Sequence, residues 1–227
     1  MEWKPMKINT LMLNKLFTKL CVCGSWRFVD MLCLDEEDLS SVPIPCGAVI
    51  LRFLLTEQHE LFREEQVEEG ELVFGGLTVF FLRNKVVNSC GTVALLHTVA
   101  KNSTHMEYHG DSPVKKLAET YWMTPLNKAA YLEMSQAIRE TYYDVAAQGQ
   151  CQVEADHVNF HLTTFVKVNG ILYELDPRME GPVNHGDTQD NSFIWDAARV
   201  CREFVEREEG EVDFSAMAFC CSKKAHT

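Results

Sequence analysis

Hydrophobic residues recur every three to four positions in several segments of the chain, and this spacing is typical of amphipathic helices. Residues 8–20 and 192–208 both follow the pattern, so each is expected to form a helix. Thr124 and Pro125 are expected to open a third, long helix that runs to about Ala147, because threonine caps helices and proline suits their first position.

Other segments are short, apolar and rich in β-branched or aromatic residues, which predicts buried strands over 47–55, 78–82 and 212–219. Helices and strands are therefore mixed along the chain, and the fold class is α/β or α+β. The sequence contains no internal repeat and no linker rich in Gly, Ser or Pro, which favours a single domain over residues 1–227.

A β-hairpin is predicted around residues 169–170, because Asn-Gly between two strand-like runs is the strongest short-range hairpin signal. With these two residues as the loop, Thr163 faces Asp176 and His161 faces Arg178. Side chains alternate between the faces of a strand, so all four share one face of the hairpin. Asp176 then lies diagonally across from His161, close enough for its carboxylate to meet the imidazole.

The pair of His161 and Asp176 has the geometry of a general base and its orienting group. A carboxylate that accepts a hydrogen bond from one ring nitrogen fixes the tautomer and leaves the other nitrogen to take a proton. The competing interpretation is a surface hairpin on which the two residues meet by chance.

Cys90 is the candidate nucleophile. Asn88 or Ser89 can cap a helix that begins beside Cys90 and runs to about Lys101. A helix N-terminus has free N–H groups and the positive end of the dipole, which stabilise a thiolate and can hold an oxyanion. We therefore expect the pKa of the Cys90 thiol to be lowered towards neutrality. A buried cysteine that only packs is the competing interpretation.

His97 shares the predicted helix with Cys90 but is not a suitable base for it. The two residues lie ~10 Å apart along the axis, at ~1.5 Å per residue. A general base must come within ~3 Å of the proton that it takes. His97 is therefore expected to lie in the core or to support the site from behind.

Composition and charge narrow the class of function. The chain has 227 residues, 46% of them hydrophobic, and a formal net charge of −12. Nucleic acid and anionic membrane surfaces are poor partners for such a charge, whereas a basic protein ligand is favoured. The nine cysteines are irregularly spaced, and neither a secretory signal nor a membrane-spanning run is evident. These features predict reduced thiols, no zinc site and a cytoplasmic location, and the cysteines alone would also suit a redox-sensing protein.

Three segments of the chain resemble the signature segments of the ubiquitin C-terminal hydrolases. They are residues 88–92 (NSCGT), 158–161 (VNFH) and 172–178 (LYELDPR). The segments occur in the family's order and the flanking sequence resembles one isozyme in particular, so the resemblance covers essentially the whole chain. It implies a papain-like α/β/α fold with a central antiparallel sheet and a knotted backbone.

The resemblance also implies hydrolysis of amide, ester or thioester bonds at the C-terminal glycine of ubiquitin. Cys90 would form an acyl-enzyme, with His161 as general base and Asp176 as its orienting group. A crossover loop at about 148–157 would cover the site and admit only small or disordered leaving groups. No metal, cofactor or stable membrane anchor is expected, and the protein should be a monomer or weak dimer. The residues expected to contact ubiquitin are Pro5, Met6, Asp30, Arg178 and Phe214.

Three positions depart from the family's pattern. Asn84 stands where the family places a glutamine as oxyanion donor, and its side chain is one methylene shorter. Val87 stands where the family has a glycine. Seven residues follow Cys220, so the C-terminal prenylation box of one isozyme is absent. The first two departures leave an alternative function open, in which the chain binds and stabilises ubiquitin with impaired catalysis.

Overall fold

One antiparallel sheet organises the fold. The computed structural model describes residue 3 and residues 8–20, 22–69, 79–83, 88–108, 110–148, 160–208 and 213–221. Within these residues the main sheet has six strands in the order β2-β8-β3-β5-β6-β7. The strands are β2 (Trp26–Met31), β3 (Cys46–Leu54), β5 (Phe160–Val168), β6 (Ile171–Leu175), β7 (Val183–Asp187) and β8 (Phe214–Cys221). Two short strands, β1 (Val22–Cys23) and β4 (Glu107–Tyr108), pair separately.

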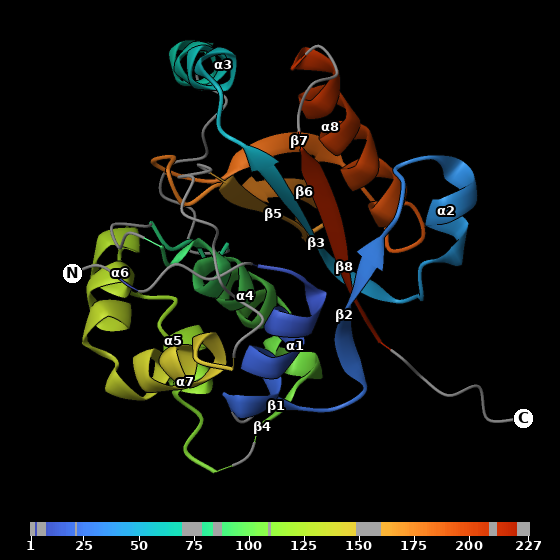
Figure 1. Ribbon diagram of the computed structural model, residues 1–227. Helices are drawn as coiled ribbons and strands as arrows, with labels where there is room; N and C mark the ends of the chain where they lie inside the picture. Colours follow the sequence, from blue (N-terminus) through green and yellow to red (C-terminus); the bar gives the residue numbers. More distant parts are fainter. Residues whose placement is uncertain are drawn as a thin grey trace, which may run out of the picture.

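Helices cover both faces of the main sheet (Figure 1). On one face lie α1 (Thr10–Lys19), α4 (Cys90–Lys101), α5 (Pro113–Ala118), α6 (Pro125–Met134) and α7 (Gln136–Ala146). On the other lie α2 (Glu36–Ser41) and α8 (Phe193–Arg207), while α3 (Glu57–Glu69) stands beyond one end of the sheet. The predicted α/β/α architecture with a central antiparallel sheet is confirmed. The path of residues 149–159, which bears on the predicted knot, lies outside the described residues.

Strand β3 shows why the predicted apolar run at 47–55 is a strand. Alternate residues of a strand point to opposite faces of its sheet. Ile50 packs into the core shared with α1 and α4, and Leu51 packs into the core shared with α8. Both are fully buried, so a central strand between two helical layers needs apolar residues at consecutive positions rather than at every second one.

Capping explains where the predicted helices begin. Asn9 precedes α1, and its side chain accepts a hydrogen bond from the backbone N–H of Met12 at 2.9 Å. Thr124 caps α6 in the same way through the N–H of Asn127, with Pro125 at the first helical position, as predicted. Each cap satisfies one of the N–H groups that a helix leaves without an internal partner.

The prediction of one long helix from Pro125 to about Ala147 is wrong, because the helix breaks at Ser135. This residue has an extended backbone (φ −72°, ψ 94°) and separates α6 from α7. Leu132 and Ile138 are both buried, but a separation of six positions in a continuous helix would place them about 120° apart around its axis. The break lets both helices turn their apolar faces towards the same core.

The predicted strand at 78–82 is also wrong, since residues 79–83 form no strand and residue 78 lies outside the described part. The apolar run is buried, as its composition suggests. One of its backbone N–H groups bonds to a side chain instead of to a neighbouring strand: the N–H of Leu82 donates to Nε2 of His97 at 3.0 Å. A short buried apolar run cannot be assigned to a strand from its pattern alone. Within the described residues, no helix combines the length and hydropathy needed to cross a bilayer.

Candidate active site

Cys90 is the first residue of α4, as predicted, and the turn before it is held firmly. Asn88 adopts a left-handed conformation (φ 66°), which asparagine tolerates better than most residues. Its side chain donates to the carbonyl of Trp3 at 2.9 Å, and its own carbonyl accepts from the hydroxyl of Tyr142 at 3.1 Å. Ser89 occupies the N-cap position, and its side chain makes no cap bond to the first turn of α4.

The expected fall in the pKa of the Cys90 thiol does not occur in this structure. Burial raises the pKa to about 11, while the backbone N–H groups of Gly91 and Cys90 and the positive charge of Arg52 act in the opposite direction. The helix terminus therefore favours the thiolate as predicted, but desolvation of the sulfur is the larger effect.

The predicted pairing of His161 with Asp176 is present. Nε2 of His161 lies 2.7 Å from Oδ1 of Asp176, and both side chains are buried. The hairpin has the predicted register, with facing residues from Val168–Ile171 to Thr164–Leu175. Asp176 follows directly after the last of these pairs. The register set by the turn at 169–170 therefore places it diagonally across from His161.

The prediction that Arg178 faces His161 in the hairpin is wrong. Strand β6 ends at Leu175 and the chain turns at Pro177, so the ladder never reaches Arg178. Instead, the backbone N–H of Arg178 donates to Oδ1 of Asp176 at 2.8 Å. The side chain of Arg178 is exposed and forms an ion pair with Glu60 of α3.

Between Cys90 and His161, both of which lie in the described part of the chain, there is no hydrogen bond. Because Asp176 engages Nε2 of His161, Nδ1 is the nitrogen left for the sulfur. Phe53 faces His161 across the β3–β5 ladder, and the two rings meet edge to face at 5.5 Å. Phe214 faces Phe53 across the next ladder, so the three rings form a row across β8, β3 and β5.

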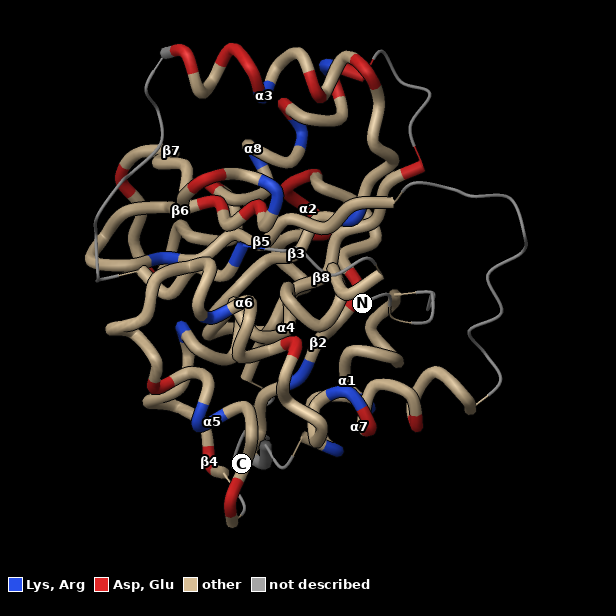
Figure 2. Tube along the Cα trace, turned by 90° about the vertical axis from the view of Figure 1, so that its left-hand side faces the viewer, with Lys and Arg blue, Asp and Glu red and all other residues tan. Residues whose placement is uncertain are grey.

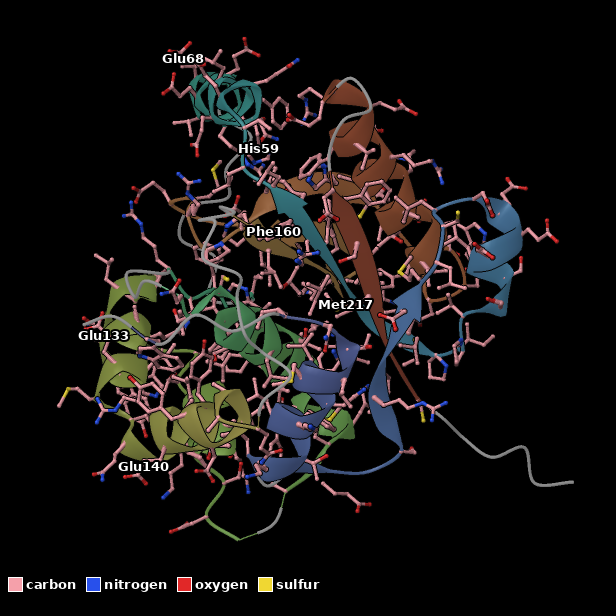
Figure 3. The ribbon with its side chains drawn as sticks, viewed as in Figure 1. His59, Glu68, Glu133, Glu140, Phe160 and Met217 are labelled. Carbon is pink, nitrogen blue, oxygen red and sulfur yellow. The ribbon has the colours of Figure 1, made fainter. Side chains whose placement is uncertain are left out.

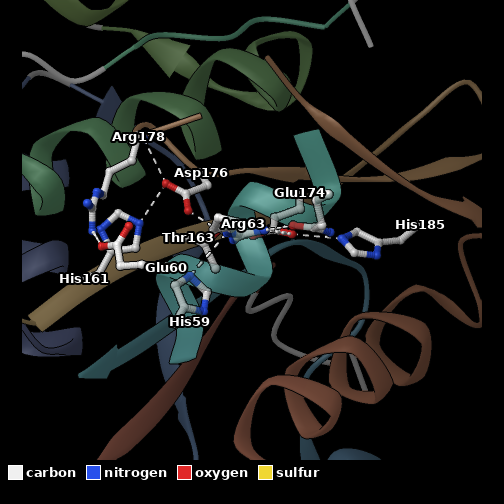
Figure 4. A network of polar contacts seen from close by, with 10 residues as sticks. His59, Glu60, Arg63, His161, Thr163, Glu174, Asp176, Arg178 and His185 are labelled. Atoms are coloured by element: carbon white, nitrogen blue, oxygen red, sulfur yellow. Dashed lines mark hydrogen bonds and ion pairs between the residues drawn. The ribbon is translucent and has the colours of Figure 1, made fainter. Parts of the chain in front are cut away.

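Sequence reasoning missed a buried polar network behind Asp176 (Figure 4). Arg63 reaches down from α3, with its guanidinium 3.0 Å from Oδ2 of Asp176 and in an ion pair with Glu174. Glu174 also accepts a hydrogen bond from the hydroxyl of Thr163 at 3.0 Å and contacts Nε2 of His185 at 2.9 Å. All five side chains are buried or nearly so, and Arg63, Thr163 and His185 place donors around the carboxylates of Glu174 and Asp176.

The network keeps both carboxylates ionised. Burial alone would raise the pKa of Glu174, but Arg63 and His185 outweigh it and lower the pKa to about 2. His161 and Arg63 likewise hold the pKa of Asp176 far below its usual range, against the effect of burial. Both folded-state pKa values lie below the unfolded ones of ~4, so the stabilisation is present above that pH and is lost as the pH falls towards 2.

A sequence signal for this network exists in α3. His59, Arg63 and Gln66 recur at helical spacing and are all buried, although glutamates dominate the rest of the helix. A polar stripe on the inner face of an acidic helix indicates buried partners elsewhere in the chain. His59 accepts a hydrogen bond from Nε of Arg63 at 3.2 Å, and burial lowers its pKa to about 3, so it is neutral.

Arg52 is a second functional candidate that the sequence analysis missed. It lies on β3, opposite Leu162 of β5 and Ser215 of β8. Its guanidinium stacks 3.5 Å from the ring centroid of Phe160, and this contact holds a half-buried cation on the Cys90 side of the sheet. In Figure 3, the labels of Phe160 and His59 show the end of the sheet at which β5 begins and α3 follows β3. Arg52 is thus placed to stabilise negative charge on the sulfur.

Three of the predicted ubiquitin contacts are exposed at the end of the sheet that carries His161. Asp30 lies near the end of β2, Phe214 begins β8, and Arg178 follows β6. In this antiparallel order these three strand ends lie on the same side as the start of β5. Pro5, Met6 and Asn84 lie outside the described residues, as do Val87 and most of the predicted crossover loop.

A hollow of about 380 Å³ opens beside Asp176, between α3 and the turn after β6. Its wall includes Glu60, Glu64 and Glu68 from α3, and Arg178 from the turn. Figure 2 shows the acidic residues gathered along α3 above this region. The hollow adjoins the carboxylate of Asp176 rather than the sulfur of Cys90, because Cys90 is not part of its lining.

Comparison with known proteins defines the class of this enzyme. The sequence profile of ubiquitin carboxyl-terminal hydrolase, family 1, matches residues 3–206. Ubiquitin carboxyl-terminal hydrolase isozyme L1 of Sus scrofa is 49% identical over 221 residues, which cover 97% of this chain and 99% of that protein. Isozyme L1 of Homo sapiens has the same identity and coverage. The chain is therefore a cysteine-type hydrolase. It belongs to the ubiquitin carboxyl-terminal hydrolases of family 1.

The fold is shared with solved structures as well. The catalytic domain of Trichinella spiralis UCH37 bound to ubiquitin vinyl methyl ester superposes with a TM-score of 0.77 at 19% identity. The match covers 98% of this chain and 97% of that one. A longer form of the same protein, also bound to ubiquitin vinyl methyl ester, gives a TM-score of 0.69 over 96% of this chain and 81% of that chain.

Replacing Arg63 by methionine should destabilise the protein strongly. The Arg63→Met variant leaves Glu174 and Asp176 as neighbouring buried carboxylates without their cation, which typically costs about 3–5 kcal/mol. Urea unfolding at neutral pH measures the loss. The control is Arg199→Met, which removes an exposed pair with Glu203 and should change stability by less than about 0.5 kcal/mol. Equal stability of the two variants would contradict the role given to Arg63.

Replacing Arg52 by leucine should make the Cys90 thiol harder to ionise. The Arg52→Leu variant loses a nearby positive charge, so the alkylation rate of Cys90 by iodoacetamide, followed by peptide mass spectrometry, should reach its midpoint at higher pH. At a fixed pH below this midpoint we expect a roughly three- to tenfold slower reaction. Arg199→Leu is the matched control, and an unchanged midpoint in Arg52→Leu would reject the electrostatic role.

Proposed function

We propose that the chain releases small adducts and peptides from the C-terminal glycine of ubiquitin, with Cys90 as nucleophile, His161 as general base and Asp176 as orienting group. The contact of 2.7 Å between His161 and Asp176 carries this proposal, because it fixes the imidazole with one nitrogen left over. Residues 1–227 would act as one catalytic domain, in the cytoplasm, as a monomer or weak dimer.

The proposed reaction begins with transfer of the thiol proton from Cys90 to Nδ1 of His161. The sulfur attacks the carbonyl carbon of the terminal glycine, and the bond to the leaving group breaks as His161 returns the proton to it. A thioester then joins ubiquitin to Cys90. His161 next takes a proton from water, which attacks the thioester, and the thiol and the ubiquitin carboxylate are released.

Negative charge on the carbonyl oxygen needs donors near the start of α4. The N–H groups of the first helical turn, which also act on the sulfur, are suited to this task. Asn84 would supply a side-chain amide in place of the family's glutamine. Both kinds of donor would stabilise the negative charge that develops on the carbonyl oxygen in the transition state. They would therefore raise the rate of the chemical step rather than the affinity for the substrate.

Recognition of ubiquitin would use the exposed residues at the His161 end of the sheet, together with Pro5 and Met6. Asp30, Arg178 and Phe214 offer an acidic, a basic and an apolar contact there. The net charge of −12 and the acidic surface of α3 suit the basic C-terminal tail of ubiquitin. The solved relatives bound to ubiquitin vinyl methyl ester support the choice of partner.

Removal of the nucleophile should separate chemistry from binding. In Cys90→Ala, release of a fluorophore from the C-terminus of ubiquitin should fall to background, because no thioester can form. Binding of ubiquitin, measured by titration calorimetry, should persist. Cys33→Ala removes an exposed cysteine and should keep full activity. Full activity in Cys90→Ala would refute the assignment.

The oxyanion role of Asn84 can be tested by changing its length. Asn84→Ala should lower kcat about 10²–10³-fold with KM nearly unchanged, the usual cost of losing one such donor. Asn84→Gln restores the family's residue and should match or exceed the unmodified rate. An unmodified protein that binds ubiquitin without turnover, and gains activity in Asn84→Gln, would instead favour the function in ubiquitin binding. No effect of Asn84→Ala would exclude the donor role.

A further inference from the structure

We propose that Cys46 and Cys220 form an oxidation-sensitive thiol pair, which hydrogen peroxide converts to a disulfide between β3 and β8. The two residues face each other directly in the antiparallel ladder of these strands. Facing residues in such a ladder have Cα atoms ~4.5 or ~5.5 Å apart. Both separations fall within the range of ~4.4–6.8 Å that a disulfide requires.

A β-bulge at Gly47 brings the two cysteines opposite each other. From Ala48–Phe219 to Phe53–Phe214 the ladder is regular, but Cys46 pairs with Cys220 instead of with the next residue of β8. One extra residue in β3 therefore shifts the pairing, as a bulge does. A regular ladder would have placed Gly47 opposite Cys220.

The bulge also turns both thiols to the same face of the sheet. Cys46 and Cys220 both pack in the core on the α8 side. The bulge is anchored by Asn102, whose side-chain amide donates to the carbonyl of Gly47 at 3.2 Å. A Cβ at position 47 would lie 2.3 Å from the Asn102 side chain, so a larger residue there would displace this amide from its hydrogen bond.

The two thiols face each other across the ladder and differ in access to solvent. A hydrogen bond with Cys46 and burial raise the pKa of the Cys220 thiol, which is fully buried. Cys46 is only partly buried and donates its own S–H to the carbonyl of Ala48 at 3.3 Å. Cys46 is therefore the sulfur that a small oxidant reaches first, and Cys220 is placed to resolve the product.

One molecule of hydrogen peroxide supplies the oxidation that converts the two thiols to a disulfide. The sulfur of Cys46 attacks a peroxide oxygen, the O–O bond breaks, and a sulfenic acid and water form. The sulfur of Cys220 then attacks the sulfur of Cys46 and displaces the hydroxyl group, which leaves as water with the thiol proton. Two thiols and one peroxide thus give one disulfide and two waters.

This disulfide would lie at the end of β8 away from the catalytic residues. Phe214 begins β8 at the His161 end, and Cys220 comes six residues later. Oxidation should therefore fasten the C-terminal strand of the sheet without displacing His161 or Asp176. The neighbouring Cys221 is not equivalent, because its sulfur lies 3.0 Å from the hydroxyl of Ser25.

Peptide mapping of the full chain tests the proposal. The protein is treated with hydrogen peroxide, remaining thiols are blocked with iodoacetamide, and trypsin is used without reductant. Cleavage after Arg27 and Arg52 puts Cys46 in peptide 28–52, and cleavage after Arg207 and Lys223 puts Cys220 in peptide 208–223. We expect these peptides to be joined and to separate on reduction with dithiothreitol.

Four variants assign the link, since each peptide carries a second cysteine. The cross-link should disappear in Cys46→Ala and Cys220→Ala, and should persist in the matched controls Cys33→Ala and Cys221→Ala. Urea unfolding of the reduced variants verifies that each is folded. The oxidised protein should unfold at a higher urea concentration than the reduced one, because the link constrains the unfolded chain. Sulfinic or sulfonic acid at Cys46 without a cross-link, or a link that persists in Cys46→Ala, would overturn the proposal.

Discussion

The proposed active site depends on one buried cation, the guanidinium of Arg63, which lies between the carboxylates of Glu174 and Asp176. Two neighbouring carboxylates cannot both stay ionised in a protein interior unless a positive charge and hydrogen bonds offset their desolvation and repulsion. If Asp176 were protonated, it would no longer attract the imidazole of His161 as strongly. The orientation of His161, the proposed general base, therefore depends on Arg63, which acts on it through Asp176.

This dependence explains the position of α3, which stands beyond the sheet and is charged over most of its surface. Its ordering cannot come mainly from a broad apolar face, because its few apolar residues lie between glutamates. The inward stripe of His59, Arg63 and Gln66 supplies the attachment instead. The ion pairs of Arg63 thus hold both α3 and the carboxylate of Asp176, so α3 contributes to the proposed site.

The parts of the fold that could be predicted from sequence are those set by local rules. The Asn-Gly loop fixed the register of β5 and β6, and with it the meeting of His161 and Asp176. The Thr124 cap predicts the start of α6, and the phase change between Leu132 and Ile138 is the local signal for the break at Ser135. Contacts between distant segments were not accessible in this way. Arg63 meets Glu174 across 111 residues, and no local pattern records that partnership.

The pKa of Cys90 shows why a helix terminus is not sufficient to make a nucleophile. With a pKa of about 11, only about one thiol in 10⁴ is ionised at pH 7. The N–H groups of α4 and the charge of Arg52 reduce the cost of ionisation but do not cancel the desolvation of the sulfur. The missing stabilisation must come from a group that takes the proton and stays beside the sulfur as a cation. In the proposed mechanism this group is His161, which Asp176 holds through Nε2 so that Nδ1 is left for the sulfur. Reactivity would then depend on the approach of β5 to the start of α4 rather than on either element alone.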